Sequence, residues 1–337
     1  MIQTICVGAL VFVICYFFRR FYKMDLNWWI IASPLLCGTA FFFIRKDWML
    51  YALLIGICSL LKNDNPGRKR GAIALVLAIV GLLTHEAFFF WGIPVVILAL
   101  VRNKTTRTEG IVGLVIFAVI FAMTCIFKGS EEQARMIVES WKGFPGCENV
   151  AFDPRNSLGA LGWDLEDTVR MHIRRNFSNG YPLWFVAPLR LFVALFVYYF
   201  LSNFLFTFRR NNSNAADSEK TSFSALLLCN FVCMIPMFMF LSNDWGRLYQ
   251  YVAISTFGAY ITLSRVKFLS LFPEKVLVGV AKFNSCLEKI AKPKAWLMTV
   301  MLLLMTVRPW HFSPELYPER TIIGSVIIRV ARFFSLL

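Results

Sequence analysis

The sequence is poor in charge, and poorest in acidic charge. Only 16% of its 337 residues are charged, with 20 acidic residues against 35 basic ones. Soluble domains carry about 25% charged residues, so the composition excludes an ordinary soluble protein. The chain also lacks a P-loop, a GxGxxG fingerprint, an HExxH helix and a GxSxG elbow, which removes the common sites for nucleotide, zinc-protease and serine-hydrolase chemistry. Cys229 and Cys233 share a helix face without a third ligand nearby, so neither a metal nor another cofactor is expected.

Long apolar runs take the place of the missing charge. Hydrophobic residues make up 58% of the chain, and a helix of about 20 apolar residues crosses the hydrocarbon of a bilayer. We therefore predict an all-α fold, a polytopic transmembrane helix bundle of about ten spans with one longer outer loop, in a single integral membrane domain over residues 1–337. The predicted spans are 2–18, 27–44, 48–61, 71–84, 87–101, 110–127, 183–208, 222–242, 248–263 and 295–307.

Two stretches leave alternatives open. Residues 71–84 and 87–101 form either two short helices or one long helix with a polar break, and Pro94 would kink the second half. The C-terminal residues 321–337 have one apolar face. They form either an interfacial helix or an extra span.

Basic residues gather in every second connection between the predicted spans, while the connections between them are short or close to neutral. Cytoplasmic loops of membrane proteins are enriched in Lys and Arg, so the alternation predicts a multi-pass protein with its N-terminus outside. Anionic lipid then explains the net charge of +15, and no nucleic-acid partner is expected. The basic connections are 19–23, 62–70, 102–107, 209–220 and 265–294.

The longest hydrophilic segment, residues 128–182, is predicted to be an extracytoplasmic loop with an amphipathic helix. Apolar residues recur in it at every fourth position, and such a stripe predicts a helix lying on the outer membrane surface. Arg174 and Arg175 close this helix and could meet phosphates. A surface helix without chemistry is the favoured alternative. The stripe consists of Leu165, Val169, Ile173 and Phe177.

A His-Glu pair, His85 and Glu86, lies between two apolar stretches. Partial desolvation would suit Glu86 to act as a general base near neutral pH, while His85 would orient a substrate or be the base itself. The alternative is a solvated polar turn capped by Thr84. We favour the functional interpretation because ionisable groups at membrane depth are costly.

A second group of polar residues, Asp244-Trp245-Gly246-Arg247, separates two predicted spans. Arg247 could bind a phosphate bidentately, Trp245 could stack on a sugar face, and Asp244 could bind hydroxyls or hold the arginine. A tight outer turn with an interfacial Trp and a local salt bridge explains the residues equally well.

Four more ionisable residues fall, like the two motifs above, on the predicted outer side of the membrane. Arg45 and Asp47 precede one span, and Arg308 and His311 follow another. If the spans form a bundle, these groups and the two motifs would surround one mouth that faces away from the cytoplasm.

With these residues in view, the chain resembles bacterial polysaccharide polymerases of the Wzy or EpsG type, which make O-antigen, capsule or exopolysaccharide. The resemblance rests on residues 81–94, on Gly159-Ala160-Leu161-Gly162-Trp163 and on Asp244 to Arg247. It covers the middle of the chain, from the fourth to the ninth predicted span. The chain departs from the family in lacking a clear N-terminal outer loop with acidic and Arg residues, for which Arg45 and Asp47 are the nearest counterpart.

The resemblance implies a membrane glycosyltransferase-type enzyme that joins lipid-linked oligosaccharide repeat units on the outer face of the bacterial inner membrane. The substrate would be a polyprenyl diphosphate-linked glycan, and a flippase or a chain-length regulator would be a partner beside the membrane lipids. Catalytic roles would fall to Glu86, His85 and Asp244. Binding of the diphosphate and the sugar would fall to Arg247, Trp245, Arg45, Arg174, Arg175, Arg308 and His311.

Two other functions remain open at this point. A transporter or flippase for a lipid-linked or anionic solute would need polar groups at mid-membrane, and Asn203 and Asn230 are the main candidates. A membrane acyltransferase that decorates a glycan could also use His85.

Overall fold

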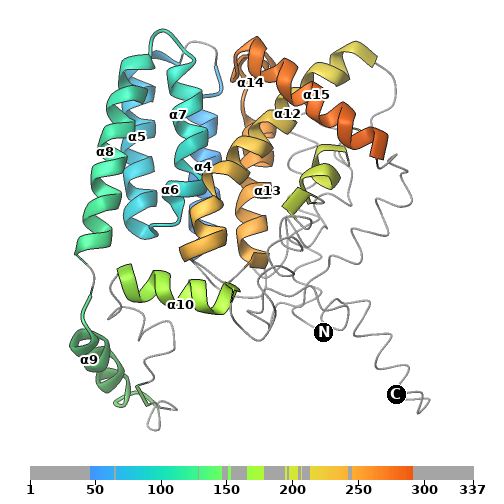
Figure 1. The fold of residues 1–337 in the computed structure, drawn as a ribbon. Coiled ribbons are helices and arrows are strands. Elements are labelled where there is room, and N and C mark those ends of the chain that lie inside the picture. The colour runs from blue at the N-terminus through green and yellow to red at the C-terminus, as the bar shows by residue number, and fades with distance from the viewer. Residues whose placement is uncertain are drawn as a thin grey trace, which may run out of the picture.

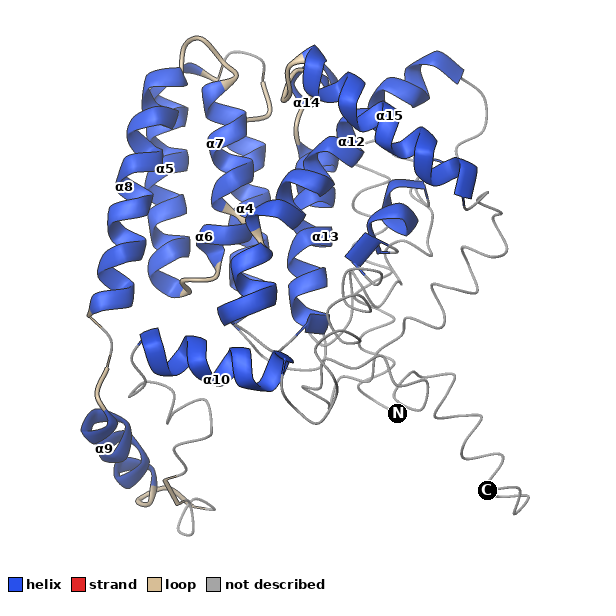
Figure 2. Cartoon of the chain, viewed as in Figure 1, coloured by secondary structure: helices blue, strands red, loops and turns tan. Residues whose placement is uncertain are grey.

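The computed structural model is all-α in the part of the chain that it describes. Twelve helices lie in this part and no strand does (Figure 2), so the predicted fold class is confirmed there. The described residues are 46–63, 66–127, 129–145, 151–152, 165–177, 194–195, 197–203, 206, 213–241 and 245–290. Outside them lie the predicted spans 2–18, 27–44 and 295–307, most of 183–208, and the C-terminal stretch 321–337.

Six helices stand side by side and form the body of the structure (Figure 1). They are rich in Leu, Ile, Val and Ala, and their inward faces share one apolar core. Burial of such faces, more than intrinsic propensity, stabilises helices in proteins. The six are α4 (Lys46–Leu60), α5 (Gly67–Thr84), α7 (Ile93–Val101), α8 (Arg107–Ile126), α12 (Ser213–Cys233) and α13 (Trp245–Thr262).

Contacts at both ends show that α4 and α13 run parallel. Near their N-termini the Tyr251 hydroxyl donates to Asp47 Oδ1 at 2.5 Å. Just after their C-termini the Ser264 amide donates to the Lys62 carbonyl at 3.0 Å. Both helices therefore begin at one end of the bundle and finish at the other.

The starts of α5 and α8 and the end of α7 lie at the same end of the bundle as the C-termini of α4 and α13. Arg68 Nε at the start of α5 lies 3.7 Å from Glu109 Oε1 at the start of α8. Arg102, just after α7, donates to the carbonyl of Ser270 at 2.7 Å. The connections that follow α4, α7 and α13 thus share one end, which we call the basic end.

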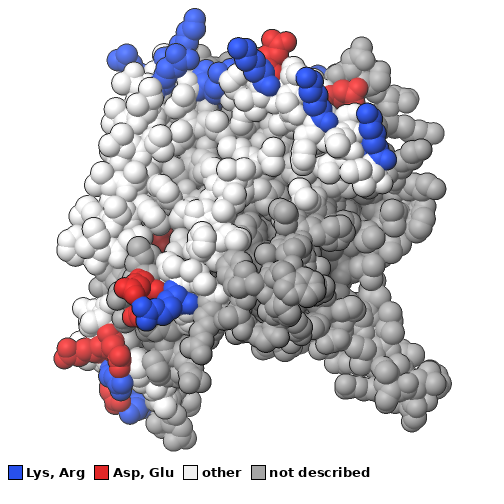
Figure 3. All heavy atoms as spheres, in the orientation of Figure 1, with Lys and Arg blue, Asp and Glu red and all other residues white. Residues whose placement is uncertain are grey.

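We call the opposite end the far end; it holds the starts of α4 and α13 and residues 84–92. The two ends differ in charge. Figure 3 shows Lys and Arg side chains gathered along the basic end and a band without charged side chains over the middle of the helices on this face. The described parts of the predicted basic connections 62–70, 102–107 and 265–294 therefore lie together at one end, as the sequence predicted.

Two further helices lie beyond the far end. α10 (Leu165–Phe177) forms in the segment where the sequence predicts an amphipathic helix, and it packs beside the π-helical turn η3 (Met237–Leu241). α9 (Glu131–Trp141) was not predicted. It begins with a capping box in which Ser130 and Gln133 bond to each other's backbone amides, a pattern that the sequence shows plainly.

The basic end carries two helices in a segment that the sequence analysis treated as a connection. These are α14 (Arg265–Leu269) and α15 (Glu274–Ile290), and α15 packs against α12. The sequence does contain a helical signal here, since apolar residues recur at intervals of three and four residues. They are Leu277, Val280, Phe283 and Leu287.

The chain breaks into separate helices at the His-Glu pair, which decides between the two alternatives for residues 71–84 and 87–101. α5 ends at Thr84, and His85 has extended backbone. The single turn α6 (Phe88–Trp91) follows and meets α7 at Gly92. Pro94 stands in the first turn of α7, two residues after the join at Gly92, so the second half is interrupted next to the proline that was predicted to kink it.

The described helices do not establish ten spans. One of them, α8, is long and apolar enough to cross a bilayer by length and composition, and two shorter apolar stretches are Met49–Leu60 and Phe88–Val101. Boundaries also differ from the prediction, since α12 begins at Ser213 and α13 at Trp245. The number of spans therefore stays a prediction.

Gly92 should be intolerant of a side chain, because the ring of Phe88 fills the space beside it. Phe88 is fully buried, and a Cβ at Gly92 would lie 2.3 Å from its Cε2 atom. Gly92→Ala is expected to lower the free energy of unfolding by about 1–3 kcal/mol, measured by thermal unfolding of the purified protein. Gly279→Ala in α15, where nothing lies within 4 Å of the added carbon, is the control. Equal stability of the two variants would contradict this packing.

Candidate functional site

The far end brings together three segments that are distant in the sequence. Asp47 from α4 is 2% exposed, and it accepts the hydrogen bond from Tyr251 of α13. The indole of Trp91, from α6, stacks on the Tyr251 ring with 4.9 Å between the ring centroids and 5° between the planes. Tyr51, one helical turn after Asp47, lies edge-on to both Trp91 and Tyr251. We call these four residues the far-end cluster.

The hydrogen bond is what makes a buried carboxylate tolerable at Asp47. Removing a charged group from water is costly unless it is bonded, and a hydrogen bond to a charged group contributes about 1.5–3 kcal/mol net. Aromatic pairs such as Trp91 with Tyr251 add about 0.5–1.5 kcal/mol each. The far-end cluster therefore fixes α4, α6 and α13 relative to one another.

Asp47 departs from its expected place. It was predicted to lie among the polar groups around one mouth of the bundle. The structure instead buries it within the bundle, because its partner Tyr251 lies more than one turn inside α13. The cluster also holds a polar donor, since Trp91 Nε1 is buried and has no hydrogen-bond partner among the described residues.

His85 and Glu86 form a bonded pair, with 2.9 Å between His85 Nδ1 and Glu86 Oε2. The side chain of His85 is 14% exposed and that of Glu86 is 59% exposed. The described helices therefore do not enclose Glu86: the turn after α5 directs the carboxylate out of the packed helices. The histidine is the buried member of the pair.

This geometry assigns different roles to the two nitrogens of His85. An ionised carboxylate only accepts hydrogen bonds, so Nδ1 of His85 carries the proton that Glu86 accepts. In the neutral imidazole Nε2 is then the unprotonated nitrogen, which suits it to take a proton from another molecule. Thr84 does not cap this turn as predicted, because its hydroxyl donates to the carbonyl of Val80 at 2.8 Å within α5.

Trp245 and Arg247 belong to the first turn of α13 and not to a loop. Arg247 precedes Tyr251 by four residues, about one helical turn. The backbone thus places Arg247 one turn further toward the far end than the far-end cluster.

Several predicted site residues cannot be placed by their side chains. Arg174 and Arg175 lie in α10, on the far-end side of the bundle (Figure 1), but the structure describes neither side chain. The residues that lie outside the described ones altogether are Asp244, Arg45, Arg308 and His311.

The mid-chain amides that a transporter might have used are bonded within the protein. Asn230 Nδ2 on α12 donates to Ser255 Oγ and Thr256 Oγ1 of α13, both at 2.9 Å. Asn203 Nδ2 donates to the carbonyl of Tyr199 at 2.9 Å. The Asn230 bonds join α12 to α13, whereas the Asn203 bond lies within one helical segment. Asn230 Oδ1 is buried and has no hydrogen-bond partner among the described residues.

No group of three or more His, Cys, Asp or Glu side chains that could hold a metal ion lies in the described part of the chain. No family model, no curated protein and no solved structure matches the sequence.

Sequence reasoning missed Tyr251, Trp91 and Tyr51. Each lies inside an apolar run, where an aromatic residue is ordinary. One signal was available: Tyr51 follows Asp47 by four residues, just as Tyr251 follows Arg247, so each charged residue has an aromatic neighbour one turn further along its helix.

Tyr251→Phe should cost more stability than Tyr198→Phe. The first change removes a bond to a carboxylate, whereas the second removes a bond to the neutral amide oxygen of Asn284 at 2.7 Å. We expect losses of about 1.5–3 and about 0.5–1.5 kcal/mol in the free energy of unfolding, measured by denaturant or thermal unfolding. The opposite order would contradict the assignment of the Tyr251 bond as the stronger of the two.

Proposed function

We propose that this protein is a membrane-embedded polysaccharide polymerase that joins lipid-linked oligosaccharide repeat units on the outer face of the bacterial inner membrane. In this proposal the helices continue through the rest of the chain as a bundle of about ten spans. The basic end lies at the cytoplasmic surface, in agreement with the enrichment of Lys and Arg in cytoplasmic loops. The far end then faces outward.

The surface of the helices supports a membrane location. The outward face of α8 is apolar at successive turns, with Val115 61% exposed and Val119 52% exposed. The neighbouring α5 shows the same feature at Val76 and Leu83. Contiguous exposed apolar surface of this kind marks contact with lipid or with a partner, and the charge-free band between the two ends in Figure 3 fits the hydrocarbon layer.

The observation that carries the proposed activity is the meeting of three predicted site segments at the far end. Asp47, Trp91 and Tyr251 hold the start of α4, the segment after the His-Glu pair and the start of α13 against one another. An acid-base pair and the helix turn that carries Arg247 are thereby kept at one end. Polar groups in a membrane protein are costly and are usually functional.

The reaction is the attack of an acceptor hydroxyl on the anomeric carbon of a lipid diphosphate-linked glycan. A new carbon–oxygen bond forms to the acceptor oxygen, and the bond from the anomeric carbon to the diphosphate oxygen breaks with its electron pair. Nε2 of His85 takes the hydroxyl proton, and Glu86 stabilises the imidazolium that results. No nucleotide is consumed, because the donor carries its own leaving group.

Stabilisation of the leaving diphosphate is assigned to Arg247, since a guanidinium can bind two phosphate oxygens at once. Arg45, Arg308 and the α10 residues Arg174 and Arg175 are the further candidates for this role. Positive groups placed where charge develops in the transition state are commonly the largest contribution to catalysis.

The two alternative functions have less support. A transporter needs polar groups that are free to meet a solute at mid-membrane, and Asn203 and Asn230 already have protein partners for their amide nitrogens. An acyltransferase would share His85 but would need a path for an acyl donor from the cytoplasmic side. No feature of the described residues indicates such a path.

Glu86→Gln should reduce polymer formation in cells by roughly 100-fold or more, while single lipid-linked repeat units accumulate. The amide cannot hold the His85 imidazolium as the carboxylate does. Gel analysis of the extracted polysaccharide measures the chain-length distribution. The control is Glu139→Gln on α9, which removes an exposed carboxylate that pairs with Lys142. Normal polymer from Glu86→Gln would remove the pair from the mechanism.

The proposed topology predicts the positions of inserted reporter tags. A tag after Glu86 and a tag beside Trp245 should both be detected from outside the inner membrane. A tag after Lys104, at the basic end, should be detected only from the cytoplasm. Detection of the tags at Glu86 and Trp245 on opposite faces of the membrane would contradict the proposed active site, since its parts would then lie on different sides of the bilayer.

A further inference from the structure

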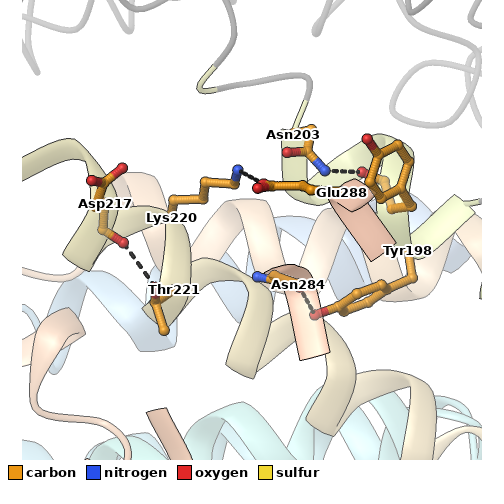
Figure 4. A network of polar contacts seen from close by, with 8 residues as sticks. Tyr198, Asn203, Asp217, Lys220, Thr221, Asn284 and Glu288 are labelled. Carbon is orange, nitrogen blue, oxygen red and sulfur yellow. Dashed lines mark hydrogen bonds and ion pairs between the residues drawn. The ribbon is translucent and has the colours of Figure 1, made fainter. Parts of the chain in front are cut away.

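α15 is fixed on the bundle by polar contacts along one of its faces. Asn284 Oδ1 accepts the hydrogen bond from the hydroxyl of Tyr198 at 2.7 Å, and Glu288 pairs with Lys220 of α12 at 2.5 Å. Figure 4 shows both contacts crossing between elements that are distant in the sequence. Apolar residues on the same face, including the buried Val280, add to the packing. The rotation of α15 about its axis is therefore set.

The opposite face of α15 carries a row of three lysines. Lys275, Lys282 and Lys289 are exposed and follow one another at intervals of seven residues. Seven residues are close to two helical turns, so the three ammonium groups lie along one line. None of the three makes a hydrogen bond or an ion pair with a described residue, in contrast to Lys220. We call these three residues the lysine row.

The lysine row lies at the border between the charged end and the apolar surface. Figure 3 shows Lys and Arg side chains in a row over α15, directly above the band without charged side chains. Exposed apolar residues stand beside the lysines, with Val276 43% exposed and Val278 48% exposed. A row of cations above apolar surface is the pattern of a helix at a lipid interface.

We propose that the lysine row of α15 binds the phosphate headgroups of anionic lipids in the leaflet at the basic end. The proposal rests on the membrane location given above but not on the reaction. Juxtamembrane lysines are attracted to anionic lipid, and their long apolar stems can lie along lipid while the ammonium groups reach phosphates. A soluble acidic partner would leave the neighbouring valines and the charge-free band below them uncovered, which favours lipid as the occupant.

The test compares lipid-dependent stability in three forms of the full-length protein. The triple variant is Lys275→Gln, Lys282→Gln, Lys289→Gln. The matched control removes the same charge from α9 and α10 through Arg135→Gln, Lys142→Gln, Arg170→Gln, all exposed. Each protein is purified in a neutral detergent, and its Tm is measured with added phosphatidylglycerol and with added phosphatidylcholine.

Phosphatidylglycerol should raise the Tm of the natural protein and of the matched control by several degrees more than phosphatidylcholine does. The triple variant should lose at least half of this difference, and a triple Lys→Arg variant at the same positions should keep it. Equal responses of the natural protein and the triple variant would overturn the proposal. So would an equal loss in the matched control, or an equal rise with inorganic phosphate, because each would show general charge attraction without a lipid site.

Discussion

The arrangement of this protein depends on one buried hydrogen bond, from the hydroxyl of Tyr251 to the carboxylate of Asp47. A carboxylate that is 2% exposed must be bonded, or it would cost several kilocalories per mole. Satisfying it fixes the register of α4 against α13, and the stacking of Trp91 on Tyr251 brings in the segment that follows the His-Glu pair. One polar contact thus sets the position of three segments at the far end.

The two ends of the bundle solve the same physical problem in different ways. At the far end one carboxylate is bonded by a phenol among aromatic rings. At the basic end Glu219 and Glu288 are bonded by Arg265 and Lys220. Between them the described helices meet mainly through apolar side chains. In the proposed membrane arrangement the apolar middle lies in lipid and the two polar ends meet different aqueous sides.

Sequence alone predicted what depends on local pattern and missed what depends on packing. The apolar runs predicted the bodies of α4, α5 and α8, and the His-Glu pair marked the break after α5. α9 and α15 were missed, although a capping box and a spacing of three and four residues signalled them. No local pattern could show that Asp47 turns inward while Glu86 turns outward, because the face that a helix presents to its neighbours is set by partners distant in the sequence.

Burial separates the residues that position the helices at the far end from the pair to which the proposed reaction is assigned. Asp47, Trp91 and Tyr251 are each no more than 2% exposed, so a sugar or a diphosphate cannot reach them in this arrangement. Glu86 is 59% exposed and bonded to His85, so this pair lies where a large substrate can approach. A general base must come within hydrogen-bond reach of the proton that it takes. The buried cluster therefore positions the helices, and the proposed reaction is assigned to the pair on the turn beside it.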